Sequence, residues 1–273
     1  MRKKPGYAAR VELPAIRILL LLACTQPVTS SAAAGPATAT PAPVVDTSRP
    51  PAPLPVVPPQ PPATMADFAA AIPPCAPART VCIGIRIHLS TQDGAPYVAP
   101  TWLAEQFAFA NRMFEPIDVS FELHAVTTID LPPIINGRKV RDAVSRGIAP
   151  VRAIDVFVVG ALADLEDPRF PLFGVHWRPA VGPRSERALA RSDAGRRYIL
   201  LASYAWGRTM AHELGHFFGL PHSTYAISIM NKTLRTEPPL EQRRFSDEEV
   251  PLMQRALRSM LKRKELVARS PAR

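Results

Sequence analysis

The chain has 273 residues, and 47% of them are hydrophobic, so it can bury a sizeable core and is not disordered throughout. Its formal net charge is +10, but the basic clusters lie towards the two ends and have no aromatic residues interleaved with them, which argues against nucleic acid as a partner. After the N-terminal region, no apolar run approaches the ~20 residues of a membrane-spanning helix.

The first 24 residues have the layout of an export signal. A basic start is followed by a short apolar run over 18–23 that ends at Cys24. The stretch LLAC resembles a bacterial lipoprotein signal, in which the cysteine is lipidated and becomes the first mature residue. Arg17 shortens the apolar run, and a leucine stands two positions before the cysteine; both depart from that pattern. We expect an exported bacterial protein, either anchored in the cell envelope through a lipid on Cys24 or secreted.

Proline and alanine dominate the segment 25–72, in which ten prolines fall within the 23 residues 41–63. Proline lacks a backbone N–H and favours an extended chain, so this segment is predicted to be a disordered spacer. A folded domain is expected over 73–265 and a basic tail over 266–273. If Cys24 carries lipid, Cys75 and Cys82 remain as an even pair, and a disulfide between them is permitted outside the cytoplasm; two unrelated thiols are the alternative.

Apolar patterns in the folded domain predict five strands and three helices. Alternating or continuous apolar residues indicate strands over 81–90, 118–126, 154–160, 173–179 and 197–203. A first helix begins near Thr101 and ends before Pro116, and a C-terminal helix opens with a capping box formed by Ser246 and Glu249. The order of these elements predicts an α/β fold with a mixed, twisted sheet.

The third predicted helix, from about Ser203 to Phe218, carries two histidines and an inward apolar stripe that begins at Trp206. His212 and His216 are four residues apart, so both project from one face and can reach one ion.

The chain after this helix can return to the same point. Gly219 stands where a helix end needs left-handed backbone, and Pro221 prevents the helix from continuing, so His222 can approach the first two histidines. Three neutral imidazoles leave a fourth tetrahedral position for water, as in a catalytic zinc site. Glu213 stands beside the first histidine and can take a proton from that zinc-bound water.

The residues His212, Glu213, His216, Gly219 and His222 match HExxHxxGxxH, the zinc signature of metzincin metallopeptidases. Met230, eight residues after His222, is similar to the Met-turn of that clan, and the spacing and Ser223 most resemble the matrixin branch.

The resemblance implies a zincin-like domain with a zinc cleft between an upper and a lower subdomain. One catalytic Zn²⁺ would be bound by His212, His216 and His222, with Glu213 as general base and Met230 beneath the ligands. An edge strand near 174–178 would bind protein or peptide substrates in extended form. We expect a monomer.

Two departures from the relatives limit the resemblance. Lys232 stands where astacin-like enzymes have a tyrosine, and the structural zinc and calcium loops of matrixins are not recognisable over 160–196, so a single metal is expected. His88, His124 and His176 are interpreted as ordinary sheet histidines, and Tyr225 as a loop residue. The sequence therefore predicts a zinc endopeptidase. The alternatives are a non-proteolytic zinc-binding envelope module and an enzyme that hydrolyses a non-peptide amide.

Overall fold

The computed structural model describes residues 54–55, 58–61, 63–76, 78–179, 196–233 and 236–269. The predicted export signal, Cys24, most of the predicted spacer and the last four residues of the predicted tail lie outside them. Within the described part, no helix is both long enough and apolar enough to cross a membrane.

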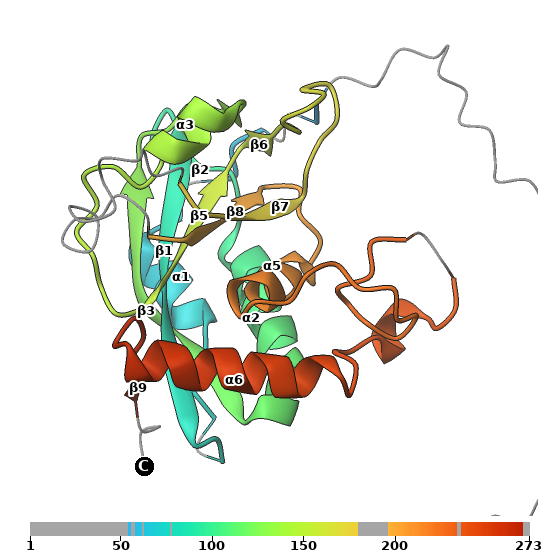
Figure 1. Cartoon of the computed structure of the whole chain (residues 1–273). Helices are drawn as coiled ribbons and strands as arrows, with labels where there is room; N and C mark the ends of the chain where they lie inside the picture. Colours follow the sequence, from blue (N-terminus) through green and yellow to red (C-terminus); the bar gives the residue numbers. More distant parts are fainter. Residues whose placement is uncertain are drawn as a thin grey trace, which may run out of the picture. The chain divides into compact units, whose positions relative to one another are not determined.

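A mixed sheet forms the centre of the domain (Figure 1). Its main strands lie side by side in the order β3 (Val119–Ile129), β1 (Val81–Gln92), β5 (Ile154–Val159), β8 (Tyr198–Ala202) and β7 (Gly174–Trp177). Neighbouring strands are parallel except for β7, which runs antiparallel to β8. Short strands β2 (Ala95–Pro96) and β9 (Ala268–Arg269) pair antiparallel with β1, and β4 (Ile134–Ile135) pairs with β6 (Ala161–Leu162) in a separate sheet. The predicted mixed α/β fold is confirmed.

Both faces of the sheet are covered, and the central strand shows why its sequence is apolar apart from Asp155. All six residues of β5 are buried. Val156 and Val158 belong to the larger core, whereas Phe157 and Val159 belong to the smaller core on the other face. The larger core includes residues of α1 (Met65–Ala71), α2 (Pro100–Met113), α5 (Thr209–Phe217) and α6 (Glu249–Lys262); the smaller lies near α3 (Arg138–Ala143) and the two-stranded sheet. Two 3₁₀ turns, Glu115–Ile117 and Leu240–Gln242, are also present.

The folded part begins before residue 73, so the predicted spacer extends too far. Thr64 and Asp67 form a capping box at the start of α1: the Thr64 N–H donates to the Asp67 carboxylate at 2.8 Å, and the Asp67 N–H donates to the Thr64 hydroxyl at 3.2 Å. Phe68 on this helix is fully buried. The last proline of the run precedes Thr64, so nothing prevents a helix there.

The C-terminal tail is also folded at its start. Leu266 is buried, and β9 pairs with β1 through Ala268 and Arg269. The boundary predicted at 265 is therefore wrong, because charge alone gave no sign of a pairing with a strand far away in the sequence.

Two helix starts differ from the prediction. α5 begins at Thr209, and Trp206 lies before it with a half-exposed side chain, so Trp206 is not part of an inward stripe. At the start of α6, the Ser246 N–H donates to the Glu249 carboxylate at 2.8 Å, but the Ser246 hydroxyl caps nothing. Only half of the predicted capping box is present.

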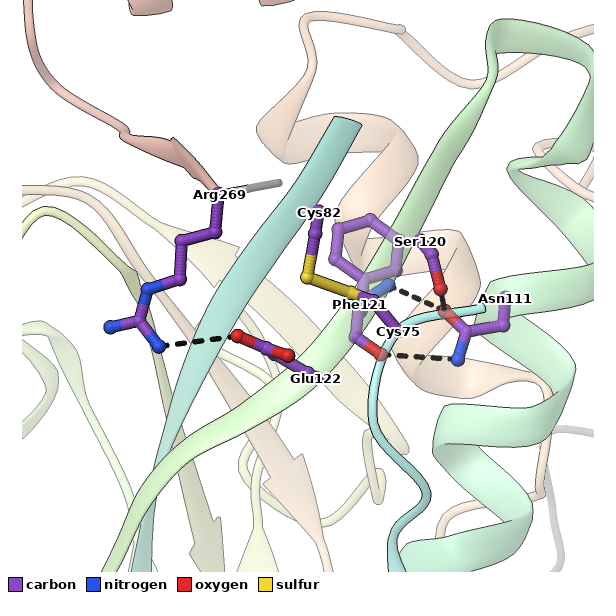
Figure 2. The surroundings of a disulfide bond; sticks show 7 residues. All are labelled: Cys75, Cys82, Asn111, Ser120, Phe121, Glu122 and Arg269. Atoms are coloured by element: carbon purple, nitrogen blue, oxygen red, sulfur yellow. Dashed lines mark hydrogen bonds and ion pairs between the residues drawn. A yellow bond between two sulfur atoms is a disulfide. The ribbon is translucent and has the colours of Figure 1, made fainter. Parts of the chain in front are cut away.

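Cys75 and Cys82 are bonded to each other in a disulfide (Figure 2). This bond ties the segment after α1 to the beginning of β1. Close by, Arg269 of β9 forms an ion pair with Glu122 of β3 at 3.1 Å. Asn111 of α2 hydrogen-bonds the main chain of Phe121, which satisfies part of the outer edge of β3. Segments from both ends of the folded chain thus close one end of the sheet.

Candidate metal centre

The three histidines of the motif meet at one point. His212 and His216 stand on consecutive turns of α5, with ring centroids 4.8 Å apart. The ring of His222 lies 4.7 Å from that of His216 and 5.6 Å from that of His212. One ligand nitrogen from each residue lies within 4.8 Å of the other two. The imidazoles therefore converge from two segments of the chain.

The return of the chain after α5 depends on Gly219. Its φ is +90°, a backbone conformation that residues with a side chain rarely adopt. The N–H groups of Gly219 and Leu220 donate back to carbonyls of the last helical turn, at 2.9 and 3.0 Å. The Ser223 N–H then donates to the Met230 carbonyl at 3.1 Å, which joins the His222 segment to the predicted Met-turn.

Backbone carbonyls orient the two helical histidines. Nδ1 of His212 lies 2.8 Å from the Ile229 oxygen, and Nδ1 of His216 lies 2.7 Å from the Leu220 oxygen. A carbonyl only accepts hydrogen bonds, so Nδ1 carries the proton in both rings and Nε2 keeps a free lone pair. This arrangement is typical of metal-binding histidines, whose second nitrogen is held by a neighbouring group.

Burial favours the neutral form that a metal ligand requires. It lowers the pKa of His212 to about 4, and it is also the main cause of the lowered pKa values of His216 and His222. His222 is the exposed member of the trio, so solvent reaches the site from its side. At neutral pH all three rings are therefore uncharged and ready to bind a cation.

Glu213 is held under the edge strand. Its side chain is 5% exposed, and Oε2 accepts the N–H of His176 in β7 at 2.6 Å. Burial raises the pKa of Glu213 to about 8, opposed by the hydrogen bond from His176. Gly174 permits this close packing, because a Cβ there would lie 2.9 Å from the Glu213 Cγ and 2.7 Å from the Thr209 Cγ2.

Met230 lies fully buried beside the helix, at a point where α5 has no side chain. A Cβ at Gly215 would lie only 2.5 Å from the Met230 sulfur and 3.1 Å from the Phe245 ring. Met230 therefore packs against α5 at Gly215, which lies between His212 and His216 in the sequence. The absence of a side chain at Gly215 makes this close approach possible.

Glu249 of α6 fixes the turn that contains Met230. The Ser228 hydroxyl donates to the Glu249 carboxylate at 2.7–2.8 Å and accepts the Met230 N–H at 2.9 Å. The same carboxylate accepts the Ser246 N–H. The C-terminal helix therefore supports the histidine cluster through the buried carboxylate of Glu249. The sequence predicted only a helix-capping role for this residue.

Three positioning residues of the site were not predicted: Gly174, Gly215 and Glu249 in this supporting role. Gly215 stands inside a helix, where glycine is unfavourable, and that position could have indicated close packing. Nothing in the sequence distinguishes Gly174 or links Glu249 to Ser228, because both relations depend on segments that meet only in the folded chain.

The other histidines lie outside the trio. His88 is buried, with its ring nitrogens 3.0 Å from the Thr127 hydroxyl and 3.2 Å from the Asp155 carboxylate, and His124 lies 2.7 Å from the Arg269 guanidinium. His176 has its ring edge-on to Phe217, and its Nε2 has no hydrogen-bond partner among the described residues.

Two other residues singled out in the sequence have different surroundings. Tyr225 is an exposed loop residue, and Lys232 lines the cleft next to the histidines.

A cleft of about 1030 Å³ opens over the site. It is lined by β7 and the loop before it, by α5, and by residues within 219–233 and 240–243. Such a volume accommodates several residues of an extended peptide, and the histidines and Glu213 all face it.

The donor set fits zinc. Three imidazole nitrogens converge from a helix and a following turn, with neutral rings and an exposed side, and this is the kind of donor set that catalytic zinc sites with one open position use. The disulfide-bonded Cys75 and Cys82 lie near Glu122, but their sulfurs are consumed in the bond and cannot act as thiolate ligands.

No protein-family model matches the sequence, and no curated protein matches it. Among solved structures, the chain is similar to archaemetzincin from Methanopyrus kandleri, with a TM-score of 0.42 and 16% identity over 64% of this chain and 96% of that one. It is similar to a promirolysin mutant from Tannerella forsythia (TM-score 0.44, 13% identity, 74% and 87% covered) and to a zinc-dependent peptidase from Methanocorpusculum labreanum (0.35, 13%, 62% and 100%). Likenesses this distant define neither a family nor an activity for this chain.

Proposed function

We propose that this protein is a zinc-dependent endopeptidase of the metzincin type, with the spacing of the matrixin branch. The observation that carries the proposal is the convergence of His212, His216 and His222 beside the buried carboxylate of Glu213, at the bottom of a cleft. A site that only stored or sensed zinc would have no need for a carboxylate next to its open side.

Each residue then has a defined task in peptide hydrolysis. Zinc, when bound, supplies positive charge that polarises a carbonyl and lowers the pKa of water. The three histidines hold the ion, and the carbonyls of Ile229 and Leu220 hold two of the rings in the correct tautomer. In its ionised form Glu213 accepts a proton from the attacking water and returns it to the leaving amine. The positive charge of zinc, when bound, would oppose the effect of burial on the pKa of Glu213 and favour this ionised form. The His176 N–H holds Oε2 of Glu213, which leaves Oε1 for the proton.

The substrate would lie along β7. This strand pairs with β8 on one side, and no other strand among the described residues pairs with its second edge. An extended peptide can add to such an edge through main-chain hydrogen bonds. The His176 N–H is already used by Glu213, so substrate pairing would depend on the other main-chain groups of β7.

Replacement of Glu213 tests the proposal. Glu213→Gln keeps the size of the side chain and its acceptor for the His176 N–H, so the variant should fold and bind zinc as the wild type does. We expect cleavage of a peptide library to fall by about 10²–10⁴-fold. Glu248→Gln, at an exposed position beside α6, is the matched control and should cleave normally.

Zinc content measured on the same samples decides between the alternatives. Equal zinc and lost cleavage support the endopeptidase. Cleavage that survives Glu213→Gln would contradict the mechanism. A folded, zinc-loaded wild type that cleaves no peptide would favour a binding module or a non-peptide amide as substrate.

We also propose that the protein is exported and anchored in the envelope through a lipid on Cys24. The basic start, the apolar run and the LLAC stretch support this proposal. In a bacterial host fed labelled palmitate, the full chain should carry label in the membrane fraction, and Cys24→Ser should carry none. Equal labelling of both would contradict lipidation at Cys24.

A further inference from the structure

Three basic side chains line the cleft beside the histidines: Arg208, Lys232 and Arg243. Arg208 stands four residues before His212, and its carbonyl accepts the His212 N–H at 3.2 Å. Burial is the main cause of the lowered pKa values of His212 and His222, but the charge of Arg208 adds to the first and that of Lys232 to the second. Cationic groups thus lie near two of the three histidines.

Arg208 has no carboxylate partner within the described part of the chain. No ion pair to it is formed there. Burial lowers its pKa, and the neighbouring charge of Arg243 lowers it further, with no acidic group acting in the opposite direction. Arg243 donates from its Nε to the Pro238 carbonyl at 3.0 Å, and its charge adds to the positive potential around Arg208.

The guanidinium of Arg208 lies instead over an aromatic ring. It is 4.7 Å from the centroid of Trp206, which is half exposed and lines the same cleft. Stacking of this kind keeps the planar group flat against the wall, with its N–H donors along the edge of the plane. A flat, supported guanidinium is well suited to bind a carboxylate through two parallel hydrogen bonds.

The carboxylates of the cleft do not neutralise this charge. Glu213 is committed to the His176 N–H, and Asp164 accepts the main-chain N–H groups of Glu166 and Asp167. Glu241 lines an adjoining pocket with Arg208 but forms no ion pair with it. The positive charge beside the histidines therefore faces whatever occupies the cleft.

We propose that the cleft selects peptides with a carboxylate close to the bond that is cleaved, and that Arg208 binds this carboxylate with support from Lys232. This inference rests on the proposed peptidase function. The carboxylate can come from an aspartate or glutamate side chain or from the C-terminus of a short substrate. Both sources present the same planar anion to the guanidinium.

The first test compares peptides that differ only in charge. Glutamate is replaced by glutamine at each position near the cleaved bond, and the free C-terminus by an amide. We expect the wild type to prefer one carboxylate form by about 10- to 100-fold in kcat/KM, the range of a charged hydrogen bond. Preference for a glutamate indicates a side chain as the source, and preference for the free terminus indicates the terminal carboxylate.

Variants of Arg208 identify the group responsible. Arg208→Gln should bring the ratio of kcat/KM for the carboxylate peptide to that for its amide counterpart close to one. Arg208→Lys should keep part of the preference for the carboxylate, and Arg208→Glu should favour peptides with lysine at that position. Arg258→Gln, at an exposed position on α6, is the matched control and should keep the wild-type ratio. Circular dichroism and zinc content confirm that each variant is folded. An unchanged ratio in folded Arg208→Gln overturns the inference.

A second readout needs no turnover. Calorimetry with the Glu213→Gln protein should show tighter binding of the carboxylate peptide than of its amide counterpart, and the added Arg208→Gln change should remove the difference. Cleavage without any carboxylate preference overturns this inference and leaves the proposed function intact. Carboxylate-dependent binding by a wild type that cleaves nothing supports the inference as a binding preference and overturns the proposed endopeptidase.

Discussion

The two ends of the domain are built in different ways. At the metal centre, the histidines and the carbonyls that orient them lie close in the sequence: His216 and Leu220 are four residues apart, and His212 and Ile229 are seventeen apart. At the other end, Glu122 and Arg269 are 147 residues apart, and α1, the disulfide and β9 gather around β1 and β3. A local motif can therefore encode the ligands, whereas the other end exists only when distant segments meet.

The comparison predicts that changes at the distant end affect stability and leave the metal site intact. Phe68→Ala is expected to have the largest effect, because Phe68 is fully buried in the main core and joins α1 to it. We expect the free energy of unfolding to fall by about 3–5 kcal/mol, measured by urea denaturation. The zinc affinity of the protein that remains folded should be unchanged.

The matched control for this change is Phe170→Ala, at a side chain that is 54% exposed. Its effect on unfolding should stay within about 0.5 kcal/mol. A loss of zinc affinity in folded Phe68→Ala would show that the two ends are coupled and would break the comparison.

Removal of the disulfide should have the next largest effect. Cys75 and Cys82 are seven positions apart, so the bond closes a short loop. The double change Cys75→Ser and Cys82→Ser should lower the free energy of unfolding by about 2–3 kcal/mol, mainly because the unfolded chain gains freedom. Reduction of the wild type should lower it by a similar amount, and zinc content should not change in either case. If reduction had no effect on unfolding, the bond would contribute nothing to this end of the sheet.

The same contrast explains how much of the molecule the sequence predicts. The five strands and the α5 histidines follow from periodicity and spacing, which act over a few residues. α1 was missed because proline-rich chain surrounds the Thr64 and Asp67 capping box, and β9 because a two-residue strand carries no period of its own. The predicted early start of α5 fails since Trp206 has helical spacing but remains half exposed in the cleft.

The supporting residues of the metal centre could not be predicted from the sequence for a related reason. Gly174 matters only because β7 crosses above Glu213, and Glu249 only because α6 passes the turn at Ser228. Spacing specifies which side chains share a face of one helix. It does not specify which strand or helix packs against that face.

At the metal centre the comparison predicts the opposite behaviour, in which zinc affinity changes more than stability. Gly215→Ala would place a Cβ 2.5 Å from the Met230 sulfur and 3.1 Å from the Phe245 ring, so the buried Met230 side chain beside the ligands must shift. We expect zinc affinity to fall by about ten- to a hundredfold, measured by competition with a chelator. The free energy of unfolding should fall by about 2 kcal/mol because of overpacking.

Gly207→Ala is the control for this change. Its new Cβ would have no contact closer than 3.9 Å, so zinc affinity should match that of the wild type. Wild-type affinity in Gly215→Ala would mean that Met230 does not help to position the ligands.

The smallest expected effect comes from two buried serines that both contact Glu249. The Ser228 hydroxyl bonds the Glu249 carboxylate and the Met230 N–H, whereas the Ser246 hydroxyl has no partner among the described residues. Ser228→Ala leaves a buried N–H and part of a buried carboxylate unsatisfied, and should cost about 1.5 kcal/mol of stability with a severalfold loss of zinc affinity. Ser246→Ala removes an unpaired hydroxyl, so denaturation and zinc titration should show a neutral or slightly stabilised protein. Equal costs for the two changes would mean that Glu249 supports α6 alone, and that the metal centre does not depend on the C-terminal helix.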